Sequence, residues 1–438
     1  MDWKEIYENR QCSAEEAVKL IKSGDRVAFS QMAGEPAVLV DAMVVNACSY
    51  RNVTISHMTT LGEGLYTHPE YKENFRWEGW FADYTTKECI IQGHGDFMPV
   101  YFHEMPRMMR NGLIPIDVFM VMVAPPDERG YCSMGVTVDY AYQGVKSGKV
   151  VLAEVNDQMP ITYGETSIHV SELDKMVLTS HPLTELARPK IGPVEEAIGR
   201  NCATLIEDGS TIQLGIGAIP DALLSQLKNK KHLGIHSGMI SDGVVDLVEA
   251  GVIDCSEKSI DKGKIVVAVL MGTKHLYDFI NKNPMIEMRT ADYVHSLNVI
   301  SQNSKFVAIN SCIQVDFMGQ VVSDCMGVKQ FSGVGGQMDF MRGATEALDG
   351  KGKAIIAMSS TAVKKDGTLI SKIVPFIDYG AAITVSRYDV DYIVTEYGIA
   401  SLKGKNLKDR ARQLINIAHT DVREELKVAF KERFNAEF

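Results

Sequence analysis

Two related stretches decide the fold: GDRVAFSQMAGEP at residues 24–36 and GSTIQLGIGAIP at residues 209–220. A helical pattern precedes each stretch, and each continues from a glycine turn into a short apolar run and then a polar or glycine-rich loop. Each copy therefore predicts a helix, a tight turn, a buried strand, a loop and a second helix. The repeat indicates an α/β fold of two related open parallel-sheet domains that arose by internal duplication.

The loop after the strand differs between the two copies. The first copy has side chains at Ser30–Ala33, whereas the second has glycines at both ends of Gly215–Gly217. Since glycine has no Cβ, the second loop can bring its backbone close to a ligand that side chains would exclude. Two related halves, only one of them specialised in this way, predict a site built between domains.

Further apolar runs predict the remaining strands, and helical patterns alternate with several of them, as in parallel sheets. The expected strands are residues 26–29, 53–57, 118–123 and 150–155 in the first half, and 211–214, 265–269, 306–309, 354–358 and 393–394 in the second. A helical pattern over residues 406–428 is expected to close the fold. Ligands of such sheets gather beyond the carboxyl ends of the strands.

The segment 183–193 predicts the boundary between the domains. Within it, Pro189 and Pro193 bracket residues 190–192, proline ends regular structure, and the second copy of the repeat begins just after the segment. We therefore expect an N-terminal α/β domain over residues 1–190 and a C-terminal α/β domain over residues 191–438, the second of which carries the glycine loops. A chain of 438 residues is too long for one ordinary core.

Composition narrows the function classes. Apolar residues make up 45% and charged residues 23%, which is typical of a soluble globular protein, and the polar N-terminus predicts a cytoplasmic location. With 45 basic and 56 acidic residues the net charge is −11, which argues against a nucleic-acid surface. The eight scattered cysteines form no CxxC pair, and no histidines have HExxH spacing, so we expect no metal site and no disulfide framework.

A second glycine-rich motif, FSGVGGQMDF at residues 331–340, has three glycines among four residues. Backbone N–H groups in such loops, together with a following helix, favour an anionic group. A tight strand-to-helix turn at 215–220 and a surface hairpin at 331–340 are the alternative interpretations. Two such loops in one half favour a joint site made of backbone amides.

Several long motifs together resemble those of the family I CoA-transferases, in the branch that contains acetyl-CoA hydrolases and butyrate or 4-hydroxybutyrate CoA-transferases. The resemblance covers essentially the whole chain and is greatest to the 4-hydroxybutyrate enzymes. The motifs are PPDERGYCSMG at 125–135, GIGAIP at 215–220, GIHSGM at 234–239, FSGVGGQMDF at 331–340, SKIVP at 371–375 and VTEYGIASLKGK at 394–405.

The resemblance implies transfer of CoA between an acyl-CoA and a short-chain acid such as acetate, butyrate or 4-hydroxybutyrate. In this family a glutamate forms a mixed anhydride and then a glutamyl-CoA thioester, in a ping-pong sequence without a metal. Coenzyme A is then a substrate rather than a tightly bound cofactor. The expected partners are an acyl-CoA, a carboxylate and further copies of the chain in a homo-oligomer, with no nucleic acid or membrane. The resemblance assigns the oxyanion donors to the backbone amides of Ile216 and Gly336.

The sequence departs from the family at the nucleophile. The family motif His-Ser-Glu-Met reads His236-Ser237-Gly238-Met239 in this chain. Glycine has no side chain and cannot form an anhydride. The resemblance therefore implies that Gly238 marks a vacated catalytic position in a chain that binds CoA esters but transfers acyl groups very slowly; a slipped alignment is the other interpretation.

The remaining site residues are hypotheses of lower specificity. Glu396 is expected in the catalytic cleft, although a strand-end residue that accepts backbone hydrogen bonds is an equal alternative. The carboxylate of the acyl substrate is expected at Gln31, Gln213 and Asn310, each of which has a core hydrogen-bonding role as its alternative. Lys364 is expected to contact CoA, against the alternative of a solvated turn lysine. The CoA-binding set is Gly215, Ile216, Gly217, Ala218, Ile219, Gly335, Gly336, Gln337 and Lys364.

Other functions are compatible with parts of the sequence. An acyl-CoA hydrolase would use the same cleft and admit water, and a non-catalytic acyl-CoA-binding protein would have Gly238 as its native residue. A serine hydrolase at Ser237 is disfavoured because no GxSxG elbow surrounds that residue. A sugar-phosphate isomerase on a related fold fits the repeat alone but not the long motifs of the second half.

Overall fold

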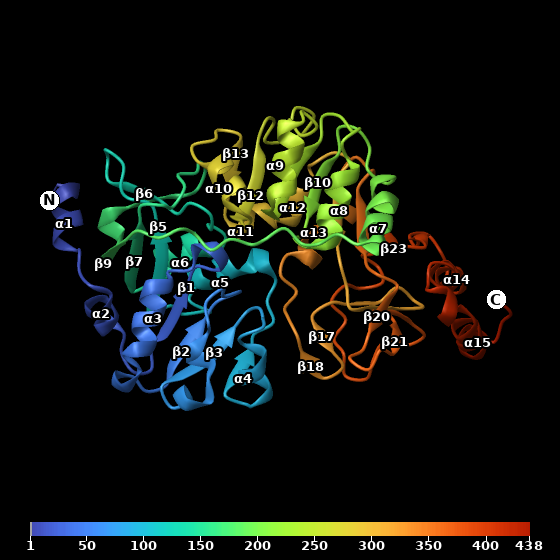
Figure 1. Cartoon of the computed structure of the whole chain (residues 1–438), viewed down its shortest axis with the longest axis horizontal. Coiled ribbons are helices and arrows are strands. Elements are labelled where there is room, and N and C mark those ends of the chain that lie inside the picture. Colours follow the sequence, from blue (N-terminus) through green and yellow to red (C-terminus); the bar gives the residue numbers. More distant parts are fainter. Residues whose placement is uncertain (1) are drawn as a thin grey trace. The chain divides into compact units, whose positions relative to one another are not determined.

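The computed structural model describes residues 2–438, which form two compact units (Figure 1). The first unit comprises the chain up to Ala187 together with Val266–Val294 and Gln330–Gly333. The second comprises Arg188–Ile265, His295–Lys329 and Val334–Phe438. Both units are α/β with large parallel sheets, which confirms the expected fold class. The domain boundary at residue 191 stays a prediction.

The first unit is built on a seven-stranded sheet in the order β4-β3-β2-β1-β5-β7-β9, and every ladder between neighbours is parallel. β1 is its central strand, and the neighbouring β5 reads VFMVMV and is buried at every position, as expected for a strand covered on both faces. The strands are β1 (Arg26–Phe29), β2 (Val53–Ser56), β3 (Phe75–Gly79), β4 (Gly95–Phe97), β5 (Val118–Val123), β7 (Val150–Asn156) and β9 (Lys175–Thr179).

Short helices and a small two-stranded sheet complete the first unit. The helices are α1 (Trp3–Asn9), α2 (Ala14–Ala17), α3 (Ala37–Val45), α4 (Lys87–Ile91), α5 (Met105–Arg110), α6 (Ala141–Ser147), α10 (Lys274–Ile280) and α11 (Ala291–Val294). Strands β6 (Tyr131–Ser133) and β8 (Ser167–His169) pair antiparallel in this small sheet. The later segment with β12 (Ile265–Leu270) and β13 (Ile286–Met288) joins the unit through backbone hydrogen bonds such as Leu270 N–H to Val136 O at 2.8 Å.

The second unit has the same strand order around its own central strand. Its strands run β11-β10-β14-β19-β23-β24, and all but the last are parallel. The order β11-β10-β14-β19-β23 matches β2-β1-β5-β7-β9 of the first unit. The strands are β10 (Thr211–Leu214), β11 (Gly234–Ile240), β14 (Val307–Asn310), β19 (Lys353–Ala357), β23 (Tyr392–Thr395) and β24 (Gly398–Ser401).

Helices and small sheets surround this second sheet. The helices are α7 (Pro193–Ala203), α8 (Ala218–Gln226), α9 (Asp242–Glu249), α12 (Leu297–Ile300), α13 (Gln337–Thr345), α14 (Leu407–Asn416) and α15 (Arg423–Phe434). The small sheets contain β15 (Gln314–Asp316), β16 (Val321–Val322), β17 (Cys325–Met326), β18 (Lys329–Gln330), β20 (Thr361–Val363), β21 (Leu369–Ser371) and β22 (Ile373–Val374). Among residues 2–438, no helix is long and apolar enough to cross a membrane.

The repeat holds at the level of single residues. Gly24 and Gly209 precede the two central strands with φ of 86° and 72°, a left-handed conformation that favours glycine. The N–H of Gly24 donates to Arg51 O, and that of Gly209 donates to Lys231 O, both at 2.9 Å. Each turn is therefore tied to the chain that leads into the neighbouring strand.

Two expectations from the sequence differ from the structure. The single helix over residues 406–428 is wrong, because α14 ends at Asn416 and α15 begins at Arg423. Between them His419 Nδ1 accepts a hydrogen bond from Asp421 N–H and caps a short 3₁₀ turn, which starts a new helix direction. The strand β11 was not expected, because its polar and glycine residues interrupt the apolar pattern.

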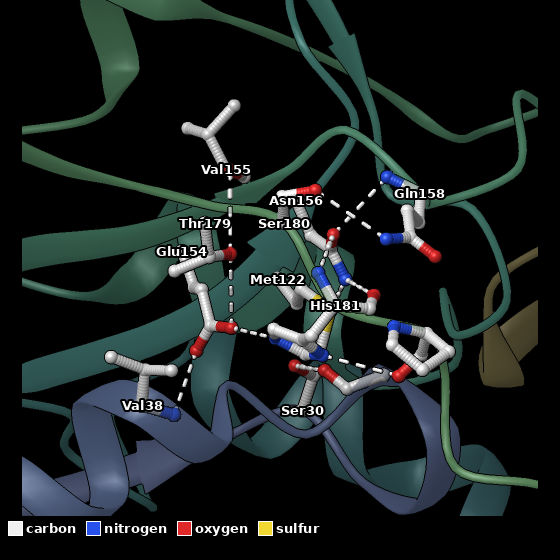
Figure 2. Close-up of polar contacts among 12 residues, drawn as sticks. Ser30, Val38, Met122, Glu154, Val155, Asn156, Gln158, Thr179, Ser180 and His181 are labelled. Atoms are coloured by element: carbon white, nitrogen blue, oxygen red, sulfur yellow. Dashed lines mark hydrogen bonds and ion pairs between the residues drawn. The ribbon is translucent and has the colours of Figure 1, made fainter.

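A buried carboxylate ties the start of α3 to β7 in the first unit (Figure 2). The Glu154 side chain is fully buried, and one oxygen accepts a hydrogen bond of 2.9 Å from the backbone N–H of Val38, in the first turn of α3. Its other oxygen lies 2.6 Å from His181 Nε2. Because α3 has no capping side chain of its own, Glu154 supplies the negative charge that its N-terminus favours.

The His181–Glu154 pair makes stability depend on pH. Burial lowers the pKa of the His181 imidazole, but the hydrogen bond and charge of Glu154 outweigh burial, so the pKa is raised above its ordinary value. Folding therefore favours protonated His181. The stabilisation is fully present below the unfolded-state pKa of about 6.5 and is lost as pH rises through the higher folded-state pKa.

We predict that the unfolding temperature falls as pH rises from about 6.5 through the raised pKa of His181, and that His181→Gln removes this component. Thermal melts followed by circular dichroism at a series of pH values measure it. The control is His232→Asn, which removes another histidine–carboxylate pair, at 2.8 Å from Asp254, on an exposed turn where solvent screens the charge. An unchanged pH profile in His181→Gln would contradict the assignment.

Candidate active site

The first glycine loop joins β10 to α8, as the sequence predicts. Gly217 has φ of 125° and ψ of −175°, a conformation that glycine alone adopts readily. A Cβ at Gly215 or Gly217 would meet no atom within 4 Å, so this backbone borders open space. Ala218 and Ile219 form the first turn of α8 directly after the loop. The loop therefore combines bare backbone with the positive end of a helix dipole.

A carboxylate lies behind this helix start. Asp221, in the first turn of α8, accepts a hydrogen bond of 3.1 Å from the Ser241 hydroxyl. Burial raises the pKa of Asp221, whereas the Ser241 hydrogen bond and the charge of Arg188 lower it. The local field at this helix start therefore includes an acidic group as well as the helix dipole.

The second glycine loop leads into α13. Gly335 has φ of 51°, and Gly336 is the capping residue that precedes the helix. The backbone N–H of Gln337 donates to Val334 O at 3.1 Å, and its side-chain amide donates to Ser311 O at 3.0 Å. Both donors of Gln337 thus hold the loop in its turn, which is a structural role beside the predicted contact with CoA.

Gly238 lies beside the first glycine loop. It is the fifth residue of β11, which pairs in parallel with β10, with Ile212 opposite Ile235. The Ser237 hydroxyl donates to Leu214 O at 3.0 Å. The same register carried one residue further places Gly238 next to Gly215, at the carboxyl ends of both strands.

The buried imidazole of His295 links position 238 to the second loop. An ideal Cβ on Gly238 would lie 2.9 Å from His295 Cε1, and one on Gly336 would lie 2.2 Å from the same carbon. Asp339, in the first turn of α13, has its Oδ2 3.7 Å from His295 Nδ1. Position 238 and Gly336 therefore both lie against the same carbon of one imidazole ring.

The two amides expected to hold the acyl carboxylate form a pair. Gln213 is the residue before the last in β10, close to the glycine loop. Asn310 is the last residue of the neighbouring strand β14. Asn310 Nδ2 donates to Gln213 Oε1 at 3.0 Å, and Gln213 Nε2 lies 3.4 Å from Asn310 Oδ1. They share the edge of the sheet at which Gly215 lies, and a ligand that bound either amide would replace a hydrogen bond between them.

Glu396 lies at a distance from this cluster. It follows β23, and its two carboxylate oxygens accept hydrogen bonds from the backbone N–H and the hydroxyl of Ser360, at 2.9 and 2.6 Å. Four strand spacings of about 4.8 Å separate β23 from β11, so Glu396 is roughly 19 Å from position 238. The carboxylate of Glu396 is held by Ser360, several strands away from Gly238.

Lys364 and Gln31 have different surroundings from the loop glycines. Lys364 is exposed in the turn between β20 and β21, where its N–H donates to Thr368 O. Gln31 belongs to the first unit, is buried, and its Nε2 donates to Asp139, whose pKa burial raises to about 6. The side-chain amide of Gln31 therefore donates its hydrogen bond within the first unit.

Sequence reasoning missed His295 and Asp339, the two residues that organise the cluster. Asp339 could have been noticed, since an acidic residue three places after the last glycine is typical of a helix start. His295 carries no local pattern and reaches the site only through the fold. In the part of the chain that the structure describes, no three His, Cys, Asp or Glu side chains are grouped as metal ligands.

Family models match both ends of the chain. The acetyl-CoA hydrolase/transferase N-terminal domain matches residues 1–185, and the C-terminal domain of the same family matches residues 272–430. The chain is 53% identical to a 4-hydroxybutyrate coenzyme A transferase of Clostridium kluyveri, over 99% of this chain and 100% of that protein.

Solved structures agree with these matches. RipA from Yersinia pestis has a TM-score of 0.93 and 34% identity, covering 99% of both chains. A 4-hydroxybutyrate CoA-transferase from Porphyromonas gingivalis has a TM-score of 0.84 and 39% identity, covering 99% of this chain and 100% of that one. The resemblance seen in the sequence is confirmed, and the chain belongs to the acetyl-CoA hydrolase/transferase family.

Proposed function

We propose that this protein is a CoA-transferase that exchanges CoA between an acyl-CoA and a short-chain carboxylic acid, with 4-hydroxybutyrate, butyrate and acetate as the candidate acids. The observation that carries the proposal is the meeting of bare glycine backbone, Gly238 and His295 at the carboxyl ends of β10 and β11. Identity of 53% to a 4-hydroxybutyrate coenzyme A transferase supports this substrate class.

The reaction needs a carboxylate nucleophile on the protein. Its oxygen attacks the thioester carbon of acyl-CoA, and CoA thiolate leaves to give a mixed anhydride. The thiolate then attacks the glutamyl carbonyl, which releases the first acid and leaves a glutamyl-CoA thioester. The second acid reverses both steps, so no proton or electron is consumed overall.

The glycine loops supply the electrostatic part of this chemistry. Each attack places negative charge on a carbonyl oxygen, and donors fixed in advance around that oxygen lower the barrier. We assign these donors to the backbone N–H groups of Ile216 and Gly336. The other loop residues, Gly215, Gly217–Ile219 and Gly335–Gln337, line the CoA thioester, with Lys364 as a contact to a CoA phosphate.

Gly238 removes the covalent part of the reaction from this chain. The glycine loops do not depend on the side chain at 238, so a chain with Gly238 binds CoA esters and transfers acyl groups very slowly. Gln213, Asn310 and Gln31 remain the candidates for the acyl carboxylate. Glu396 does not replace the nucleophile, because its carboxylate is held by Ser360.

Two other functions use the same loops. An acyl-CoA hydrolase would direct water at the thioester, and the family description includes hydrolases. A non-catalytic acyl-CoA-binding protein would need the loops and the glycine at 238 but no nucleophile. The experiments below separate all three.

We predict that Gly238→Glu raises the rate of CoA transfer by several orders of magnitude, because it restores the nucleophile beside the oxyanion donors. The assay follows acetyl-CoA formation from 4-hydroxybutyryl-CoA and acetate. Gly238→Gln is the matched control, since its amide has nearly the same size and is not a nucleophile. Equal rates for the parent, Glu and Gln forms would contradict the assignment.

We predict that the Gly238→Glu form exchanges CoA between acids rather than hydrolysing the thioester. With acetate present, CoA should appear as acetyl-CoA; without an acceptor acid, little free CoA should form. Chromatography of the CoA species with and without acetate measures both products. Free CoA released at the same rate in both conditions would instead identify a hydrolase.

A further inference from the structure

We propose that His295 is a positioning residue, a buried spacer that sets the separation between the side chain at 238 and the amides of the second glycine loop. This inference rests on the proposed function. It goes beyond that function because it assigns the alignment of nucleophile and oxyanion donors to a residue that carries no local sequence pattern. All contacts of His295 that bear on this role lie within the second unit.

The ring of His295 is held tightly in place. Its side chain is 2% exposed, and so is that of Asp339, which faces Nδ1. The ring of Phe340 packs against it with 4.6 Å between centroids, and Phe306 stacks in turn on Phe340 at 6.3 Å. A ring enclosed in this way keeps its position, because movement would open a cavity in a close-packed core.

The spacer explains why residue 336 is glycine. Gly336 has φ of −91°, which any residue can adopt, so the backbone alone does not require glycine. A Cβ there would lie 2.2 Å from His295 Cε1 and 2.4 Å from Nδ1. Glycine at 336 therefore lets the second loop rest directly on the imidazole.

The neighbouring edge of the ring, Cε1–Nε2, faces position 238. A Cβ on residue 238 would lie 2.9 Å from Cε1 and 3.0 Å from Nε2 of His295. In a chain with glutamate at 238, a shift of about half an ångström brings the Cβ into van der Waals contact with the ring. His295 thus fixes where the carboxylate starts, and a misplacement of about 1 Å costs roughly 100-fold in rate.

The kinetic test uses the Gly238→Glu chain. His295→Ala in that background should lower kcat about 100-fold while KM for the acyl-CoA changes less than about threefold, because alignment and not binding is lost. His295→Gln keeps most of the volume and should recover most of kcat. Leu414→Ala removes a buried side chain of α14, which packs against β24 at the edge of the sheet, and should lower the unfolding temperature and leave kcat unchanged.

A kcat for His295→Ala equal to that of its Gly238→Glu parent would overturn the proposal. So would equal losses of kcat in His295→Ala and Leu414→Ala, since that result describes general loss of core packing. If Gly238→Glu itself gains no activity, the proposed function fails. The role of His295 as a spacer is then tested by unfolding temperatures instead.

The stability test uses the chain with Gly238. Gly336→Ala should lower the unfolding temperature strongly in the parent and much less in the His295→Ala background, where the clashing ring is gone. Equal losses in both backgrounds would overturn the spacer whatever the activity assays give.

Discussion

The contact of one buried imidazole with two glycine backbones organises the candidate active site. His295 lies against β11 at position 238 and against the start of α13 at Gly336, through two neighbouring edges of its ring. At 336 even a Cβ would clash with the ring, and at 238 a Cβ would be tight. In the proposed reaction, the distance between the nucleophile and its oxyanion donors is therefore set by core packing, which is stiff, rather than by the loops themselves.

The duplicated sheet explains how this arrangement arose on an ordinary scaffold. In both units a central strand preceded by a left-handed glycine pairs with a strand on each side in the same order. In the first unit the loop after this strand keeps side chains, and Gln31 is engaged with buried Asp139. In the second unit the same place has open backbone at Gly215 and Gly217. The difference between the copies is thus a local exchange of side chains for accessible amides.

Much of the fold follows from the sequence, because buried parallel strands read as continuous apolar runs. β1, β5 and β10 have the predicted bounds, and α7 begins at Pro193 as the linker proline indicates. β11 escaped prediction because the buried Gly234, His236 and Ser237 interrupt its apolar residues Ile235 and Ile240. The break between α14 and α15 escaped because the helical pattern continues through a capping histidine.

The candidate site could be predicted only in part for the same reason. The glycine loops and the departure from the family motif at Gly238 are visible as local motifs, and the fold then brings Gly238, Gly215 and Gly336 together. Glu396 belongs to an equally clear motif, yet three strands lie between its strand β23 and the strand of Gly238. Strand order places two equally clear motifs far apart, and His295 joins two others. Both effects arise only in the folded chain and cannot be read from any local stretch of sequence.

The most direct test of the account is the intact mass of the protein after incubation with acyl-CoA. The Gly238→Glu form should carry the added mass of a covalently bound CoA, and the chain with Gly238 should carry none. A CoA adduct on the Gly238 chain, or its absence from the glutamate form under the same conditions, would contradict the assignment of position 238 as the vacated nucleophile.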